Sequence, residues 1–392
     1  MNYPKVILKP GKEKSVRTNR HPWIFSGAID RMPSLQPGDI ADVYSHTLEF
    51  LARAYVHPEN SIAARIISFT TEDVFEVIKD KIERAARLRA AYIPSNTTCY
   101  RVINAEADGL PGLIVDRYAD VLVMQVSTCG MEKVKEFIVK TLLALFSPRS
   151  LIEKSMSSAR SQEGLDLYQG VVAGEPVDEV LVEEEGISFF VSIPDGQKTG
   201  LFLDHREMRK YIGSLAKGKK VLNCFSYTGG FSLHALCNGA EHVTSVDISE
   251  TACRYAKKNT YQNHIPSDRH RIVCEDVFEF LGNEKQWDYD IVIIDPPAFA
   301  KKRKDIDSAT IGYRKLNSLV LSKVKQGALV LTSSCSYYID SHAFGRIVFQ
   351  AGSESQRDIR IIQHHISALD HPVSLYHPEG DYLKSLLLFV GI

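Results

Sequence analysis

The sequence predicts an α/β protein, in which a doubly wound parallel sheet follows a small β-rich domain and an α+β middle domain. From residue 219 on, strand patterns alternate with helical patterns, which is typical of a parallel sheet. The N-terminal residues instead carry short apolar runs between turn signals, and the residues in between mix both patterns. These shifts predict domains at residues 1–72, 73–190 and 191–392.

The composition is that of an ordinary globular protein. The 392 residues are 44% hydrophobic and 24% charged, which excludes a disordered, collagen-like or coiled-coil chain. With 47 basic and 48 acidic residues the net charge is −1, so any nucleic acid must be bound by local basic patches. No apolar run is long enough to span a bilayer, and the N-terminus lacks a signal-peptide pattern. Seven scattered cysteines without a C-x-x-C pair predict reduced thiols, a cytoplasmic protein and no zinc site.

The N-terminal residues predict a small β-domain. Turn signals such as Pro10-Gly11 separate its apolar runs, which lie at residues 6–8, 23–25, 50–52 and 66–67. Between residues 5 and 20, six basic residues accompany the single acid Glu13. This charge run is either a solvated face or an edge that contacts phosphates, and the sequence leaves both interpretations open.

The middle domain mixes the two patterns. Apolar residues recur at helical spacing over residues 74–91 and 131–146, whereas residues 121–126 predict a strand. Two further strands are expected near residues 175–191, joined by a tight turn at Gly186.

Strand and helix patterns alternate regularly in the C-terminal domain. Its five expected strands lie at residues 221–225, 242–246, 271–274, 289–294 and 327–332, and its first two helices at residues 232–238 and 249–263. In doubly wound sheets, ligands bind beyond the carboxyl ends of the strands. The candidate site therefore consists of the residues that follow these strands, notably Gly229, Asp247, Asp276, Asp295 and Cys335.

Glycines and acids follow the first three of these strands. Gly229 and Gly230 let a ligand approach the backbone, and Asp247 can bind ribose hydroxyls. The third glycine of a dinucleotide-binding loop is missing, which favours S-adenosylmethionine (SAM), a cofactor without phosphates. The alternative is a tight turn at the glycines and a helix cap at Asp247. Asp276 can meet an adenine amino group or be a solvated loop acid.

The fourth strand ends in the motif Asp295-Pro-Pro-Ala-Phe299. Pro296 and Pro297 offer carbonyls without N–H groups, which gives a rigid acceptor edge for a planar donor such as a nucleobase. Phe299 can stack on a base. The alternative is an ordinary stop signal at the end of a strand.

The fifth strand ends at Cys335, which three serines flank. This accessible position, at the same sheet edge as Asp295, predicts a nucleophile. The cysteines inside strand or helix patterns are expected to be small core residues, namely Cys224, Cys237, Cys253 and Cys274. None of the 13 histidines shows a metal-ligand spacing, so no metal is expected.

Together these motifs resemble the class I SAM-dependent methyltransferases. More narrowly, the chain resembles the RlmI family of 23S ribosomal RNA cytosine-5 methyltransferases, which join a PUA domain to a Rossmann-like domain. The resemblance covers nearly the whole chain and is carried by His21-Pro-Trp-Ile-Phe25, Glu106-Ala-Asp-Gly-Leu-Pro-Gly112, Gln197-Lys-Thr-Gly200, Asp204-His-Arg206, Phe225-Ser-Tyr-Thr-Gly-Gly230, Asp295-Pro-Pro297, Ser334-Cys-Ser336 and Pro378-Glu-Gly-Asp-Tyr-Leu-Lys384. Asp195-Gly196 departs from the expected Gly-Gly, and the N-terminal patch is only modestly basic.

The resemblance implies SAM as the cofactor. The residues that it implies for SAM binding are Lys198, Thr199, Asp204, Arg206, Phe225, Ser226, Tyr227, Thr228, Gly229, Asp247, Ile248, Asp276, Val277 and Asp295. Arg206 can pair with the methionine carboxylate, and the alternative for Lys198 and Arg206 is a surface salt bridge. The implied partner is RNA, either 23S ribosomal RNA or an assembling large subunit, with no membrane and no metal. Homo-oligomer formation is left open.

The chemistry expected of this family is methylation of cytosine C5. Cys335 adds to C6, Asp295 is the partner of N3, and the substrate is bound by Pro296, Pro297, Phe299 and Lys301. Ala298 stands where families with two cysteines have the second one, so the base for the C5 proton is unidentified. The alternatives are an exocyclic-amine N-methyltransferase, a non-catalytic RNA-binding protein and, more distantly, a dehydrogenase.

Overall fold

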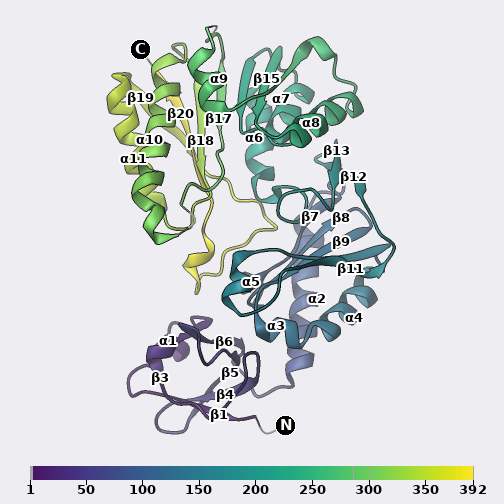
Figure 1. Cartoon of the computed structure of the whole chain (residues 1–392), viewed down its shortest axis with the longest axis vertical. Coiled ribbons are helices and arrows are strands. Elements are labelled where there is room, and N and C mark those ends of the chain that lie inside the picture. The colour runs from purple at the N-terminus through teal and green to yellow at the C-terminus, as the bar shows by residue number, and fades with distance from the viewer. Residues whose placement is uncertain (1–2, 286, 301, 392) are drawn as a thin grey trace. The chain divides into compact units, whose positions relative to one another are not determined.

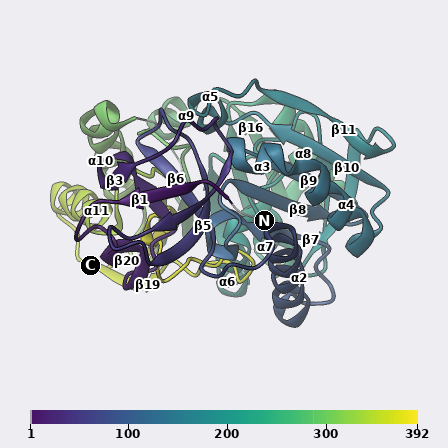
Figure 2. The same cartoon turned by 90° about the horizontal axis from the view of Figure 1, so that it is seen from below.

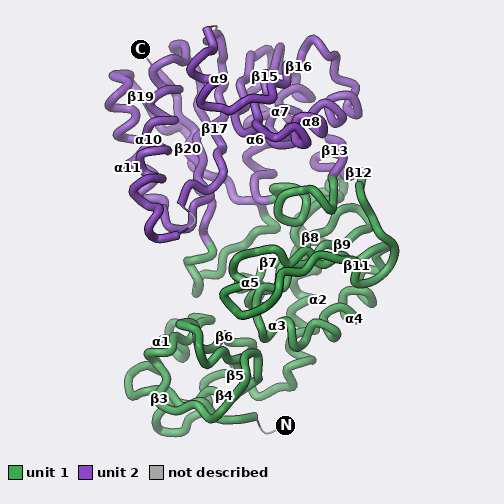
Figure 3. Tube along the Cα trace, in the orientation of Figure 1, with its two compact units in different colours: residues 1–180, 192–203, 369–380 green, residues 181–191, 204–368, 381–392 purple. Residues whose placement is uncertain are grey.

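The computed structural model describes residues 3–285, 287–300 and 302–391. These residues form two compact units, which Figure 3 distinguishes by colour. The first unit holds residues 1–180, 192–203 and 369–380, and the second holds residues 181–191, 204–368 and 381–392.

The first unit begins with a six-stranded sheet in the order β2-β6-β5-β4-β1-β3. Its strands are β1 (Lys5–Leu8), β2 (Trp23–Phe25), β3 (Ile29–Arg31), β4 (Ile40–Tyr44), β5 (Phe50–Val56) and β6 (Ile62–Ser68), and α1 (Lys14–Arg17) follows β1. Neighbouring strands are antiparallel except β1 and β4. Val6, Leu8, Ile24 and Val43 pack into one apolar core, which agrees with the β-rich domain expected here.

The same unit contains a second sheet, in the order β11-β10-β9-β8-β7. Its strands are β7 (Cys99–Asn104), β8 (Leu113–Tyr118), β9 (Val121–Val126), β10 (Ser150–Ser155) and β11 (Tyr168–Gly174), and its helices are α2 (Val74–Tyr92), α3 (Cys129–Lys133), α4 (Lys135–Phe146) and α5 (Ser158–Gln162). The Asp73 carboxylate caps α2 by accepting the N–H groups of Phe75 and Glu76. The single helix expected over residues 131–146 is interrupted at Val134, where the backbone leaves the helical conformation.

The second unit is built on a seven-stranded sheet in the order β16-β15-β14-β17-β18-β20-β19. The strands are β14 (Lys220–Cys224), β15 (His242–Asp247), β16 (His270–Cys274), β17 (Ile291–Ile294), β18 (Leu329–Ser334), β19 (Ile359–His364) and β20 (Lys384–Val390). The first five strands are parallel, as the alternating pattern predicted, and β20 runs antiparallel to β18 and β19. This sheet confirms the predicted Rossmann-like fold class.

Helices cover both faces of this sheet. They are α6 (Arg206–Leu215), α7 (Gly230–Cys237), α8 (Glu250–Gln262), α9 (Val277–Asn283), α10 (Ile306–Lys323) and α11 (Ser341–Ser355). Because side chains alternate along a strand, Val221 packs with α6 and α7, whereas Leu222 packs with α9, α10 and α11 on the opposite face. Figures 1 and 2 show α10 and α11 side by side on the latter face.

A two-stranded hairpin precedes this sheet in the chain, formed by β12 (Glu179–Glu184) and β13 (Ile187–Ser192). Glu185 and Gly186 both have positive φ, as a tight hairpin turn requires. Glu184, which is buried, forms an ion pair with Arg209 of α6 and accepts a hydrogen bond from His234 of α7. Among the described residues, no helix is both long and apolar enough to cross a membrane.

Candidate active site

The parallel register brings the carboxyl ends of five strands to one edge of the sheet. Cys224 lies beside Val246 and Ile294, and Ile294 lies beside Thr332. The segments that start at residues 225, 247, 275, 295 and 333 therefore leave the sheet at the same edge. This arrangement agrees with the site location that the strand-helix alternation predicted.

The loop after β14 has an unusual backbone. Phe225, Tyr227 and Gly229 have φ values of 60°, 47° and 89°, in the left-handed region that residues with a side chain seldom adopt. Such strain is concentrated at ligand sites. Gly230 has a different role from the one expected, because a Cβ there would lie 2.9 Å from Cδ of Arg209. The bare Cα of Gly230 thus makes room for a protein side chain.

Asp247 ends β15 with a carboxylate that two backbone groups orient. Oδ2 accepts the N–H of Tyr227 at 2.8 Å, and Oδ1 accepts the N–H of Ser249 at 2.9 Å. The cap of the following helix is Ser249, whose hydroxyl accepts the N–H of Ala252. A carboxylate has about four lone-pair sites, so each oxygen of Asp247 can also accept a ribose hydroxyl. The neighbouring Ile248 is 70% exposed and offers an apolar surface beside this position.

Asp276 is the N-cap of α9. Its Oδ1 accepts the N–H groups of Phe278 and Glu279 at 2.8 and 3.1 Å, and Val277 is buried. The geometry therefore gives Asp276 a structural role at the start of a helix. Its contact with an adenine amino group stays a prediction.

Asp295, at the end of β17, lies beside a histidine that the sequence patterns did not single out. Nε2 of His205 is 3.2 Å from Oδ2 of Asp295, and His205 is 3% exposed. The rings of Phe231 and His365 pack edge-on against the imidazole at 5.5 and 5.6 Å and hold its plane. The only sequence signal for His205 is its place inside the Asp204-His-Arg206 motif.

The residues on either side of His205 are also buried. Asp204 accepts a hydrogen bond from the hydroxyl of Tyr382. Arg206 is 0% exposed and pairs with Glu207, its Nε lying 3.3 Å from a carboxylate oxygen. A surface salt bridge, the alternative considered for Arg206, is therefore wrong, because the side chain is not at the surface. Its pairing with a methionine carboxylate stays a prediction.

Lys198 and Thr199 belong to the first unit. Lys198 has a positive φ, and its Nζ lies 4.7 Å from the centre of the Phe202 ring. Thr199 is fully buried, and its hydroxyl donates to Asp116 at 2.6 Å and lies 2.9 Å from the hydroxyl of Tyr118. The Thr199 side chain thus serves a buried network, and any contact with SAM stays a prediction.

The segment after Asp295 is held in place by the core. Pro296 is buried and Pro297 is exposed. The Phe299 ring is half-buried and lies 4.6 Å from that of Tyr313 on α10, so part of its surface is already covered. The expected stacking of Phe299 on a base is limited to the remaining surface. Lys301 lies outside the described residues.

Cys335 directly follows β18 and is half-buried, between the fully buried Ser334 and Ser336. The Ser336 hydroxyl lies 3.0 Å from the hydroxyl of Tyr313 and accepts the N–H of Ala300 at 3.2 Å. These contacts attach the cysteine loop to α10 and to the segment after Asp295. Cys335 is therefore rigidly held and accessible, as its predicted role requires.

The other cysteines confirm the sequence interpretation in part. Cys224 and Cys253 are buried, as expected of core residues. The same expectation is wrong for Cys237 and Cys274, which are exposed. Cys237 is the last residue of α7 and Cys274 the last of the edge strand β16, where the packing of the sheet ends.

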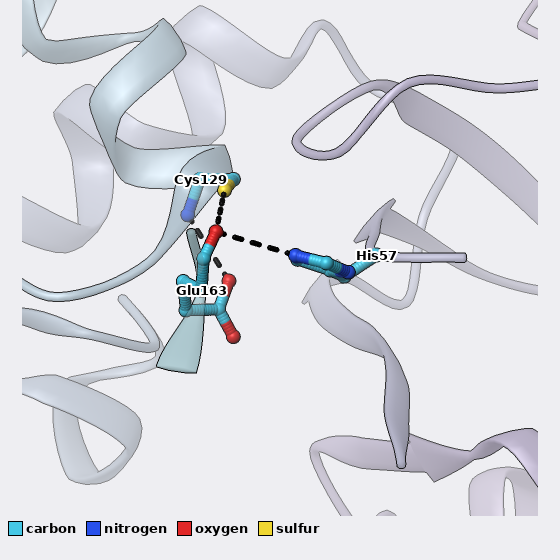
Figure 4. Close-up of side chains that lie close together, drawn as sticks. All are labelled: His57, Cys129 and Glu163. Atoms are coloured by element: carbon cyan, nitrogen blue, oxygen red, sulfur yellow. Dashed lines mark hydrogen bonds between the residues drawn. The ribbon is translucent and has the colours of Figure 1, made fainter. Parts of the chain in front are cut away.

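One group of potential metal ligands occurs among the described residues, in the first unit. His57, Cys129 and Glu163 place one ligand atom each within 4.8 Å of one another. Figure 4 shows that His57 and Cys129 instead hydrogen-bond the backbone carbonyl of Glu163, at 3.3 and 3.0 Å. The Glu163 carboxylate pairs with Arg65 at 2.7 Å and accepts hydrogen bonds from Asn60 and the Cys129 N–H. A cation here would compete with the Arg65 guanidinium, so this geometry favours a structural cluster.

The strained loop, the oriented carboxylate of Asp247 and the exposed Ile248 fit a cofactor with a ribose and no phosphate. Comparison with known proteins points to the same cofactor. Residues 164–346 match the S-adenosylmethionine-dependent methyltransferases, and residues 6–69 match a PUA-like domain. The protein is a SAM-dependent methyltransferase with an N-terminal PUA-like domain, as predicted.

Solved structures share this fold over the whole chain. The structure of SMU.776, a methyltransferase complexed with SAH, matches with a TM-score of 0.86 at 24% identity and covers 99% of this chain and 100% of that one. A SAM-dependent methyltransferase from Streptococcus mutans matches with a TM-score of 0.83 at 25% identity, with the same coverage.

Curated relatives are more similar in sequence. Ribosomal RNA large subunit methyltransferase I of Vibrio vulnificus is 40% identical over 97% of this chain and 97% of that protein. The protein of the same name from Photobacterium profundum is 38% identical, over 98% of this chain and 99% of its own length. Matches of this extent leave no part of either chain unaccounted for beyond a few residues. The chain therefore belongs to the ribosomal RNA large subunit methyltransferase I family.

Proposed function

We propose that this protein methylates C5 of a cytosine in large-subunit (23S) ribosomal RNA, through a covalent bond between Cys335 and C6. The observation that carries the proposal is the half-exposed Cys335 at the same sheet edge as Asp295. Methylation of an exocyclic amine needs no nucleophile there. The names of the curated relatives support ribosomal RNA as the substrate.

Cytosine C5 is a poor nucleophile, and the residues of the site can overcome this. Addition of the Cys335 thiolate to C6 makes C5 enamine-like, so that C5 can take the methyl group that SAM supplies. A hydrogen bond from the site to N3 lowers the barrier to that addition. We assign the N3 contact to Asp295 and the contact with the exocyclic amine to the Pro296 carbonyl.

His205 supports the role of Asp295. An N–H at Nε2 can donate to Oδ2 of Asp295, which fixes the plane of the carboxyl group and directs the other oxygen away from the imidazole. The carboxyl group is 23% exposed, so this second oxygen is accessible to a base. His205 is thus a positioning residue for Asp295 in this proposal.

We propose that RNA is bound largely outside the SAM site, by residues 1–72. The six basic residues between positions 5 and 20 are all exposed, and so are Lys302, Arg303 and Lys304 near the Asp295 motif. We further propose that residues 73–190 form a separate middle domain and residues 191–392 the methyltransferase domain. The free cysteines and the substrate favour a cytoplasmic location, and nothing in the proposed chemistry requires a metal.

The experiment that tests the function is a map of modified cytosines in ribosomal RNA, with and without this protein. A cytosine that loses its C5 methyl group when the protein is absent supports the proposal. RNA with 5-fluorocytosine at that position has no C5 proton to lose, so the native enzyme should accumulate a stable protein–RNA adduct. Loss of an amine methyl group instead, with no adduct, favours the N-methyltransferase alternative. An absence of SAM binding leaves the non-catalytic alternative.

A further inference from the structure

A buried lysine lies next to the proposed nucleophile. Lys384 begins β20, and the antiparallel register places it directly opposite Ser334, the residue before Cys335. Its Nζ donates hydrogen bonds to the carbonyl oxygens of Ser336 at 2.7 Å and of Tyr382 at 2.8 Å. Lys384 therefore contacts the cysteine loop on both sides of Cys335, although almost fifty residues separate the two in sequence.

The environment of Lys384 is unusual for a cation. The side chain is 6% exposed, and burial lowers its pKa to about 8. The negative groups that oppose this shift are Cys335, when it is a thiolate, and the carboxylates of Asp381 and Asp340. Tyr313, which packs against the same loop from α10, has a raised pKa because of its own burial and is neutral. An ammonium has three N–H bonds, and the carbonyls accept two of them without neutralising the charge.

We propose that Lys384 is the residue that activates Cys335, by holding its sulfur as a thiolate. The S–H bond of Cys335 breaks, the proton passes to the neutral amine of Lys384, and the sulfur keeps the electron pair with which it attacks C6. The inference rests on the proposed function for this last step. The thiolate–ammonium pair itself exists before any RNA binds, and it can be measured without turnover.

A structural role for Lys384 makes a different prediction. If Lys384 only ties β20 to the cysteine loop, its removal lowers stability and leaves the thiol pKa of Cys335 at its ordinary value of about 8.5. A neighbouring cation lowers the pKa of a thiol, commonly by about 1–3 units. The pH dependence of Cys335 alkylation therefore separates the two roles.

Lys81 supplies a matched control. It is also buried, donates to two backbone carbonyls, those of Ile67 and Gly109, and has a pKa that burial lowers to about 8. It lies on α2 in the first unit, whereas Cys335 belongs to the second. Lys81→Met and Lys384→Met thus remove equivalent hydrogen bonds, and only the second removes a charge beside the nucleophile.

The experiment follows alkylation by iodoacetamide in the full-length protein as a function of pH, with each cysteine quantified by peptide mass spectrometry. In the native protein, Cys335 should be alkylated with a midpoint below that of the exposed Cys237 and Cys274. Lys384→Met should raise the Cys335 midpoint and slow its alkylation at pH 7 roughly tenfold or more. Lys384→Arg, which keeps the charge, should retain a low midpoint, and Lys81→Met should leave it unchanged.

A Cys335 midpoint at or above 8.5 in the native protein overturns the proposal, and this result does not depend on how well any variant folds. So does a Lys384→Met protein that binds SAM normally and keeps the native midpoint. A low midpoint that depends on Lys384, in a protein that leaves cytosine C5 unmethylated, supports the pair and refutes the function proposed above. The two failures are therefore distinguishable.

Discussion

Replacing Asp247 by alanine tests the cofactor site most directly. In the free protein this carboxylate accepts the N–H groups of Tyr227 and Ser249 at 2.8 and 2.9 Å. If it also accepts the two ribose hydroxyls of SAM, alanine removes two further charge-assisted hydrogen bonds from the complex. At about 1.5 kcal/mol each, the low end for a charged acceptor, the loss is about 3 kcal/mol, or roughly 100-fold in Kd. Since water can replace part of this, we expect SAM binding to weaken by at least about tenfold.

The assay is isothermal titration of SAM into the full-length protein. Asp73→Ala is the matched control, because Asp73 also accepts two backbone N–H groups, those of Phe75 and Glu76, at the start of α2. Both variants should lose a similar amount of folding stability, but only Asp247→Ala should lose SAM affinity. An unchanged Kd for Asp247→Ala, in a protein that unfolds cooperatively, would refute the assignment of this carboxylate to the ribose.

Three further predictions concern the nucleophile, the RNA surface and the pH dependence of stability. Cys335→Ala should abolish methyl transfer and the 5-fluorocytosine adduct while SAM still binds, whereas Cys224→Ala, in the core, should lower the unfolding free energy by about 1 kcal/mol or more and stay active; an active Cys335→Ala enzyme contradicts the mechanism. Neutralising the basic residues between positions 5 and 20 should weaken RNA binding and flatten its salt dependence by about 0.7–0.9 log units for every phosphate that the protein no longer neutralises, and an unchanged slope identifies these residues as a solvated face. Burial raises the pKa of Glu184, but Arg209 and His234 outweigh it and hold the pKa at about 2, so this carboxylate stabilises the fold above its ordinary pKa of about 4.3 and the contribution is lost as the pH falls towards 2. Urea unfolding between pH 2 and pH 5 should show a flatter pH profile for Glu184→Gln, and parallel profiles would contradict this.

The sequence alone determined the class of fold and the edge of the sheet that carries the site. Apolar periodicity is a local property, so the five parallel strands could be predicted within a few residues of where they lie. Parallel strands place their carboxyl ends together, and this was enough to predict that Asp247, Asp295 and Cys335 share one edge. The resemblance to known methyltransferases added the cofactor and the N-terminal PUA-like domain, which the comparisons confirm.

Some interpretations failed because the burial of a residue depends on where its element ends and what covers it. Cys237 and Cys274 have apolar neighbours in sequence, but they end a helix and an edge strand and are exposed. Gly230 follows a strand in the way a ligand-binding glycine does, yet the side chain that approaches it is Arg209. Neither outcome follows from residues nearby in the chain.

Only the tertiary structure decided which groups support the reacting residues. His205 and Asp295 are 90 residues apart, and the fold of α6 against the sheet brings Nε2 and Oδ2 to 3.2 Å. Lys384 reaches the cysteine loop because β20 inserts antiparallel beside β18, in a register that places Lys384 opposite Ser334. The chemistry of a strand end is visible in the sequence because it depends on one residue and its neighbours. The protonation of that residue depends on groups that long-range strand pairing and helix packing bring to it, and such contacts leave no periodic signal in the chain.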